Sequence, residues 1–417
     1  MTKNNKYYIW LLVCAGIVHA GTPPLNLFNP YDVLLIPPRW PGTCLQFTVA
    51  FEDAFKVCAY QADDDETCTN WRKCANVLQL WQDEQDPFAA VKGDNFTSRL
   101  GEFPQLFNID DDNSAQVLFR PCGKMSIQNL MFSARYHFGW NGTLGVHLPV
   151  YHMELKNVVW SQRSDNTRVE SNLVPDMISA LETLGNINLG GWKRTGIGDL
   201  SALVYWYRDY PQAKPVLKNV HVSLRVGLTF PTGKKKDEDK ILALPFGYDG
   251  GLGVIGGGGL ELWFGQCLRG GMDAEFLQIF GTLRNRRIKT DAAQTDLLFL
   301  TKVPAFKEPG FLQHYTLYLD GAYLWRGLSA KLAYQYTKQN ADRLALCSDH
   351  FETGIANCAE SLQDWSTHSL VANLTYDFYR GKETALKPFI SVFYKHGFNG
   401  KRALLADTVG FALSLSF

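Results

Sequence analysis

Apolar and polar residues alternate along several stretches of the chain, most regularly at its C-terminus. From Val409 to Phe417 every second residue is large and apolar, and the residues between them are Gly, Ala or Ser. Successive side chains of a β-strand point to opposite faces of the sheet, so this stretch predicts a strand with one apolar and one polar face. The same alternation recurs over 220–230, 328–337 and 370–378. The pattern predicts an all-β fold.

Twelve segments have strand character, although ten or fourteen strands also fit the weak patterns near the first long segment. Short connections alternate with long ones, and the longest of these lies near 62–123. Short turns at one end and long loops at the other are typical of outer-membrane barrels, whereas a sandwich needs no such asymmetry. We therefore predict a transmembrane antiparallel up-and-down β-barrel with long extracellular loops and short periplasmic turns. Its strands are expected at 43–61, 124–138, 142–154, 197–208, 216–230, 250–265, 269–281, 312–325, 328–339, 366–379, 387–396 and 405–417.

Aromatic residues end the strands that lead to the short turns. Rings with an apolar body and a polar edge favour the boundary between lipid and water, where barrels have aromatic girdles. The core aromatics of a sandwich need not collect at one end of every second strand. The expected girdle residues are Tyr136, Trp206, Trp263, Trp325, Phe378 and Phe417.

Charged residues recur on the polar face of the alternating segments. A barrel turns that face into its lumen, where charged side chains bias which solutes pass. Because both signs occur, we expect weak charge selectivity. The expected lumen-lining residues are Arg135, Asp199, Arg225, Lys331 and Asp377.

Residues 1–20 have the features of a secretory signal peptide. Lys3 and Lys6 precede an apolar stretch, and Val18–Ala20 resembles a cleavage site with small residues. The apolar stretch is shorter than the roughly 20 residues that span a bilayer as a helix. We expect residues 21–42 to form a periplasmic N-terminal segment and residues 43–417 to form the barrel, in the outer membrane of a Gram-negative bacterium.

Eight cysteines follow the signal peptide, and export to an oxidising compartment suggests that some of them form disulfides. Cys347 and Cys358 bracket one polar segment and are the favoured pair. Four others lie in or near the first long loop, where several pairings remain open: Cys58, Cys68, Cys74 and Cys122.

The spacing of the cysteines and histidines does not match a metal site, so we predict neither metal nor cofactor. The chain of 417 residues has 41 basic and 41 acidic residues, which gives no case for nucleic-acid binding. Gly251–Gly256 matches a dinucleotide motif, but it leads into a strand rather than a helix. Glycines at a bend or a close approach inside the lumen are the better interpretation.

One long loop contains a predicted helix. Residues 173–184 have apolar positions at helical spacing, followed by Gly185, and we expect this helix to cap the outer mouth rather than constrict the lumen. An outer-membrane lipid hydrolase is the enzymatic alternative. It needs grouped Ser and His residues, and no local motif groups them, so we expect no enzyme.

Two short motifs resemble a known family. Thr195–Leu200, with the sequence TGIGDL, and Leu228–Gly233, ending in PTG, resemble the outer-membrane proteins of the meta-pathway phenol-degradation type. These proteins are distantly similar to the hydrophobic-substrate channels that include the long-chain fatty-acid transporter. The resemblance covers about 195–265, together with the C-terminal Phe417. It implies passive uptake of small, partly apolar solutes.

A surface barrel whose loops bind a partner is the alternative to a channel. In either case we expect outer-membrane lipid and lipopolysaccharide around the barrel. The strand that ends at Phe417 resembles the signal that the barrel-assembly machinery recognises in outer-membrane proteins.

Overall fold

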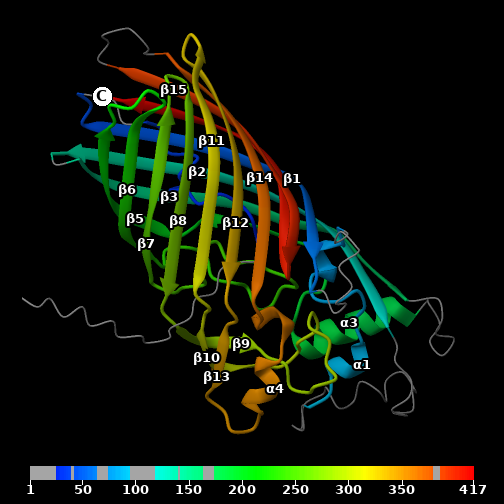
Figure 1. The fold of residues 1–417 in the computed structure, drawn as a ribbon. Helices are drawn as coiled ribbons and strands as arrows, with labels where there is room; N and C mark the ends of the chain where they lie inside the picture. Colours follow the sequence, from blue (N-terminus) through cyan, green and yellow to red (C-terminus); the bar gives the residue numbers. More distant parts are fainter. Residues whose placement is uncertain are drawn as a thin grey trace, which may run out of the picture.

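The structure, a computed structural model, describes residues 25–38, 42–62, 74–93, 118–139, 141–162, 173–378 and 386–417. Antiparallel strands form its wall (Figure 1). The wall strands are β1 (Leu45–Tyr60), β2 (Phe119–Phe138), β3 (Gly142–Gln162), β4 (Trp192–Ile197), β5 (Leu200–Pro211), β6 (Leu217–Phe230), β7 (Gly253–Phe264), β8 (Leu268–Ile279), β11 (Leu312–Trp325), β12 (Leu328–Gln339), β14 (Trp365–Asp377), β15 (Lys387–Lys401) and β16 (Ala403–Ser416).

The ladder of strands closes on itself. β1 pairs with β16 on one side and with β2 on the other, and β2 also pairs with β3. β4 and β5 pair with consecutive stretches of β3, so they are two halves of one wall strand. The closed barrel therefore has twelve strands, which confirms the predicted fold class.

The two faces of the wall differ as the alternation predicted. In β16, Val409, Phe411 and Leu413 are each almost half exposed on the outside, whereas the neighbouring Ala412 and Ser414 are buried. An apolar outer face with a polar inner face suits a barrel surrounded by lipid. The protein is thus an outer-membrane barrel. Across the described ranges, no helix is long and apolar enough to cross a bilayer.

The two ends of the barrel also differ. One end has short turns and the C-terminus, and the other has long loops that fold into a cap (Figure 1). The cap contains a second sheet of three strands in the order β13-β10-β9, which the sequence did not predict because each strand is short. The elements of the loops are η1 (Val77–Gln79), α1 (Pro87–Ala90), α3 (Val174–Gly185), β9 (Thr282–Arg287), β10 (Lys302–Glu308), β13 (Arg343–Leu346), α4 (Thr353–Asn357) and η4 (Glu360–Leu362).

The predicted helix forms as α3, and it lies over the mouth. Its buried residues Met177 and Leu181 belong to an apolar cluster with Leu78 from the first loop and Ile241 and Leu298 from two later loops. Leu404 and Met153 of the wall join the same cluster. The helix therefore caps the barrel, and the cap has an apolar core of its own.

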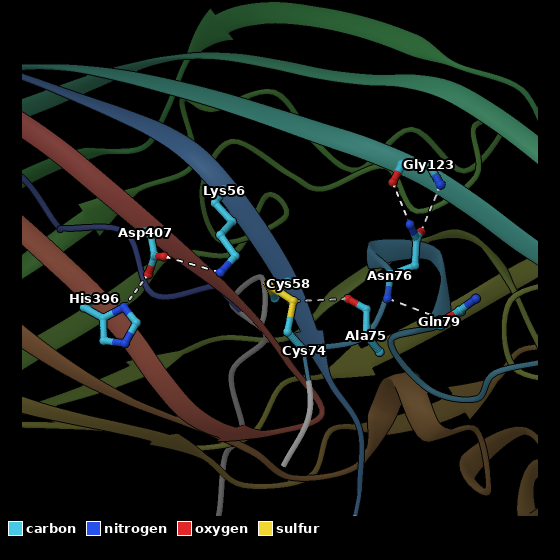
Figure 2. The surroundings of a disulfide bond; sticks show 9 residues. All are labelled: Lys56, Cys58, Cys74, Ala75, Asn76, Gln79, Gly123, His396 and Asp407. Carbon is cyan, nitrogen blue, oxygen red and sulfur yellow. Dashed lines mark hydrogen bonds and ion pairs between the residues drawn. A yellow bond between two sulfur atoms is a disulfide. The ribbon is translucent and has the colours of Figure 1, made fainter. Parts of the chain in front are cut away.

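The predicted disulfide between Cys347 and Cys358 was wrong. Cys347 and Cys358 are both exposed and unpaired, and the disulfide found among the described residues joins Cys58 near the end of β1 to Cys74 before η1 (Figure 2). Beside it, the Asn76 side chain bonds the backbone N–H and carbonyl of Gly123 in β2, both at 2.9 Å. The disulfide and this pair of bonds fasten the first loop to the wall. Of the other candidates, Cys122 is unpaired and Cys68 lies outside the described residues.

Candidate functional site

The N-terminal segment lies inside the barrel. The sequence suggested a periplasmic segment over 21–42, but the described part, residues 25–38, packs against the inner faces of β1, β2, β12, β14 and β15. Phe28 and Tyr31 are almost completely buried. Phe28 meets the ring of Phe393 edge-on, with 5.1 Å between ring centroids, and the Tyr31 hydroxyl is 3.0 Å from that of Tyr248. The segment therefore fills the middle of the lumen.

Polar groups of the wall bind this segment along its length. The Asn26 side chain donates to the Ser369 hydroxyl at 3.0 Å, and the Lys395 ammonium donates to the Asn26 carbonyl at 2.6 Å. The Glu52 carboxylate accepts the Phe28 N–H at 3.2 Å. Buried polar groups are costly unless they are hydrogen-bonded, and the wall and the segment satisfy one another here. The alternation pattern could not reveal this match, because an irregular segment has no period.

The far end of the segment is held by three other wall residues. The Asp32 carboxylate accepts a hydrogen bond from the Gln335 amide at 2.9 Å and lies 3.4 Å from His314 Nε2. The Asn373 amide donates to the Leu34 carbonyl at 3.2 Å. These contacts hold the segment against the neighbouring wall strands β11, β12 and β14.

Three chambers follow one another along the lumen, with volumes of about 150, 100 and 620 Å³ from the cap to the turn end. β14 passes all three. Trp365 touches the outer and middle chambers, Thr367 touches the middle chamber, and Asp377 touches the inner chamber. The N-terminal segment separates the middle chamber, which contacts Asp32, from the inner chamber, which contacts Val33.

The structure brings four of the five expected lumen residues to one chamber. Arg135, Arg225, Lys331 and Asp377 all line the inner chamber, whereas Asp199 lines the middle one. The four come from four different strands, β2, β6, β12 and β14. Only closure of the barrel brings them around one space.

Arg225 is an ion-pair centre rather than an open charge. Its guanidinium binds both oxygens of Asp273, at 2.7 and 2.8 Å, and one oxygen of Glu275, at 2.8 and 3.0 Å. All three side chains are almost fully buried. Gly257 of β7 lies opposite Arg225, and a Cβ atom there would be 3.2 Å from the guanidinium carbon. The missing side chain lets Arg225 reach across β7 to β8, which explains part of the glycine-rich stretch.

Asp273 and Glu275 were missed as functional residues. Their spacing already places them on one face of the predicted strand 269–281, which was the available signal. Only the register of β8 against β7 brings that face to Arg225. Two carboxylates on one guanidinium leave this part of the lumen with a net negative charge if all three groups are ionised.

The other basic residues of the inner chamber lie against aromatic rings. Lys331 Nζ is 4.7 Å from the Tyr318 ring centroid, and Asp320 is its partner in the register of β11 and β12. The Arg135 guanidinium lies 5.6 Å from the Tyr205 ring centroid. In cation–π contacts of this kind, the faces of aromatic rings in the wall stabilise the positive charges. The inner chamber thus combines aromatic rings with charged residues of both signs.

Asp199 joins the two sequence motifs in space. Its carboxylate accepts the backbone N–H groups of Gly233 at 2.8 Å and Tyr248 at 2.5 Å. The Thr232 hydroxyl donates to the Gly198 carbonyl and accepts the Leu200 N–H, both at 2.9 Å. Residues of TGIGDL and PTG therefore form one junction at the break between β4 and β5. The role of Asp199 in it is to hold the loop 231–252.

Replacing Asp199 with Ala should free this loop. Two hydrogen bonds to a charged acceptor are lost, which together stabilise the junction by about 3 kcal/mol. When trypsin is added to intact cells, we expect it to cleave the variant faster at Lys234–Lys236, which lie in the same loop. Asp209→Ala, at the turn end, is the matched control and should leave the cleavage rate unchanged. Equal rates in both variants would show that Asp199 does not hold the loop.

Five of the expected girdle residues lie on the outside at the turn end. Tyr136, Trp325, Phe378 and Phe417 are at least half exposed, and Trp206 is on the outward face of β5. Their contact with the lipid boundary stays a prediction.

Trp263 does not belong to this set. It lines the inner chamber, its Nε1 donates to Glu261 at 2.6 Å, and the Arg269 guanidinium lies 4.2 Å from its ring centroid. The reason is register. Ile255 is buried inside the barrel, so Trp263, eight residues later, shares its inward face and Phe264 does not.

One Ser–His contact in the lumen bears on the hydrolase alternative. His147 Nδ1 is 2.8 Å from the Ser133 hydroxyl, and Nε2 is 3.0 Å from the Tyr205 hydroxyl. Ser133 donates to the Pro30 carbonyl at 3.2 Å, so His147 must donate to Ser133 rather than accept its proton. The arrangement gives Ser133 no general base. Among the described residues there is also no group of three metal-ligating side chains.

Comparisons with known proteins give similarity at the level of solved structures. No family model and no curated protein matches the chain. A crystal structure of an outer membrane channel from Pseudomonas putida F1 covers 92% of this chain and 100% of its own, with 12% identity and a TM-score of 0.48. The Ralstonia pickettii toluene transporter TbuX covers 90% and 89%, with 10% identity and a TM-score of 0.31.

A Pseudomonas aeruginosa FadL homologue is similar over 90% of both chains, with 11% identity and a TM-score of 0.30. The three structures are thus described as an outer membrane channel, a toluene transporter and a FadL homologue. The assignment of a barrel rests on the strand register and the apolar outer face of this chain.

Proposed function

We propose that this barrel is a channel for passive uptake of small, partly apolar molecules across the outer membrane. The observation that carries the proposal is the row of three chambers along the lumen. Each chamber combines apolar side chains with charged ones, and several of these bind an opposite charge, as Arg225 and Asp249 do. Such walls favour molecules with an apolar body and few charges over hydrated ions, since desolvating an ion is costly.

The N-terminal segment is the proposed gate of this channel. It separates the inner chamber from the middle one, and hydrogen bonds with the wall hold its backbone and side chains. A bond to a charged group, such as Glu52 or Lys395, contributes about 1.5–3 kcal/mol and a neutral one about 1 kcal/mol, so the bonds can be exchanged one at a time as a solute passes. The solute is a small molecule, and the surrounding partners remain outer-membrane lipid and lipopolysaccharide.

Reconstitution tests the function directly. Liposomes containing the chain from residue 21 onward should take up small apolar solutes, measured by swelling, faster than liposomes without protein. Single-channel conductance in a planar bilayer should be low in the same preparation, because the segment and the cap fill the lumen. Swelling no faster than in protein-free liposomes, for inserted barrels, would contradict the proposed function and favour a surface barrel that binds partners through its loops.

A further inference from the structure

The outer chamber is a small, mostly apolar space within the cap. Leu242, Leu244 and Ile288 line it, together with Leu297 and Phe299. Its volume is about 150 Å³. A cavity of that size among apolar side chains holds one molecule as large as benzene. The chamber can therefore take the apolar body of a ligand with a single ring.

Two buried donors on the wall of this chamber have no partner among the described residues. They are Nε of Arg286 and Nε1 of Trp365. Both residues are only 5% exposed. The other donors of Arg286 are in use, since Nη1 binds Asp249 at 2.6 Å and Nη2 binds Thr282 at 2.8 Å. Unsatisfied buried donors are rare and costly, so these two indicate a missing acceptor.

The carboxylates around the chamber do not bond these two donors. Each lies beside a basic residue instead, and Glu238 Oε2 accepts no hydrogen bond. Asp249 binds both Arg284 and Arg286, and Glu238 lies 3.3 Å from both Lys236 and Arg284. Burial by itself raises the pKa of the Asp249 carboxyl, but Arg286 and Arg284 outweigh it and hold that pKa below its usual value. The remaining pairs are Lys289–Asp296, Lys307–Asp342 and Arg402–Glu360.

We propose that the outer chamber is a binding site for a small amphiphile with one ring-sized apolar body and a carboxylate head. The two carboxylate oxygens accept the hydrogen bonds of Trp365 and Arg286, and the apolar body lies among the leucines. Trp365 also lines the middle chamber, so a ligand bound to it lies at the entrance to the next space. This site deepens the proposed function, since it names the class of solute selected before the N-terminal segment.

Equilibrium binding to the full chain in detergent tests the site with two probes of the same size and opposite charge. Benzoate has a carboxylate that accepts hydrogen bonds. Protonated benzylamine has an ammonium group that only donates them. We expect benzoate to bind at least about tenfold more tightly than benzylamine, because one hydrogen bond to a charged group is sufficient for that ratio. Trp365→Phe keeps an aromatic ring and removes the indole N–H donor, so it should weaken benzoate binding about tenfold.

Trp325→Phe is the matched control, because it is the same substitution at a residue on the outside of the barrel. It should leave benzoate binding unchanged. Arg286→Lys keeps the charge beside Asp249 and removes Nε, and it should weaken binding as Trp365→Phe does. If either variant fails to fold, the other still provides the test.

The proposal is overturned if benzylamine binds as tightly as benzoate, or if benzoate binding is unchanged in the folded chamber variants. Its failure is separable from failure of the proposed function. Binding of benzoate without uptake of solutes into liposomes supports the binding site and contradicts only the proposed channel function. Uptake without binding in the outer chamber overturns the site alone.

Discussion

Replacing Arg225 with Met is expected to lower the free energy of unfolding of the barrel by about 3–5 kcal/mol. The guanidinium is the cation that binds both Asp273 and Glu275, and the two carboxylates are almost fully buried. Removing one partner of a buried ion pair leaves uncompensated charge in a medium that solvates it poorly. The measurement is equilibrium unfolding from lipid vesicles in urea, followed by tryptophan fluorescence.

Two further variants separate charge from packing at this site. Lys331→Met removes a basic residue that borders the open inner chamber, and it should cost much less than Arg225→Met. The triple variant Arg225→Met, Asp273→Asn, Glu275→Gln removes the stranded charges and should recover most of the lost stability. If Arg225→Met and Lys331→Met unfold at the same urea concentration, the cluster is solvated and the argument for a buried ion pair is wrong.

Replacing residues 26–36 with a Gly/Ser sequence of equal length should raise the rate of solute uptake into liposomes severalfold. The change removes the side chains of Asn26, Phe28 and Asp32 and keeps the length of the chain. A Gly/Ser segment behaves as a flexible coil and cannot rebuild these contacts. The middle and inner chambers should then merge into one space. Single-channel conductance should rise in the same variant.

The turn 212–215 offers the control, because a Gly/Ser replacement there alters a connection at the turn end whose residues line neither the middle nor the inner chamber. It should leave uptake unchanged. Unchanged uptake after replacement of 26–36 would place the main barrier in the cap instead, where α3 and the loop cluster cover the mouth. That result would reject the N-terminal segment as the gate.

The twelve wall strands could be predicted because their signal is local. An antiparallel strand between lipid and lumen must alternate apolar and polar residues over its whole length, as in β6 and β16. The observed β11 (Leu312–Trp325) and β12 (Leu328–Gln339) have the predicted ends. The predicted strand 197–208 was less accurate, since it is divided into β4 and β5 at the Asp199 junction.

The charged residues of the lumen could be placed on a face but not paired. Arg225 and Asp273 are 48 residues apart, and the strand register decides that they meet. Lys395 has its partner in the N-terminal segment, 369 residues away. The disulfide shows the same limit, because Cys58 and Cys74 are brought together by the return of the first loop to the wall.

The sequence alone determined the barrel wall, which of its ends has the short turns, and its two faces. Each of these follows from a period of two residues and from the lengths of the connections. The tertiary structure decided what fills the wall. An irregular segment such as 25–38 and loops such as 231–252 have no period, and their places depend on polar groups that strands far apart in the chain present to one space. Register across the sheet, rather than any local pattern, sets those meetings.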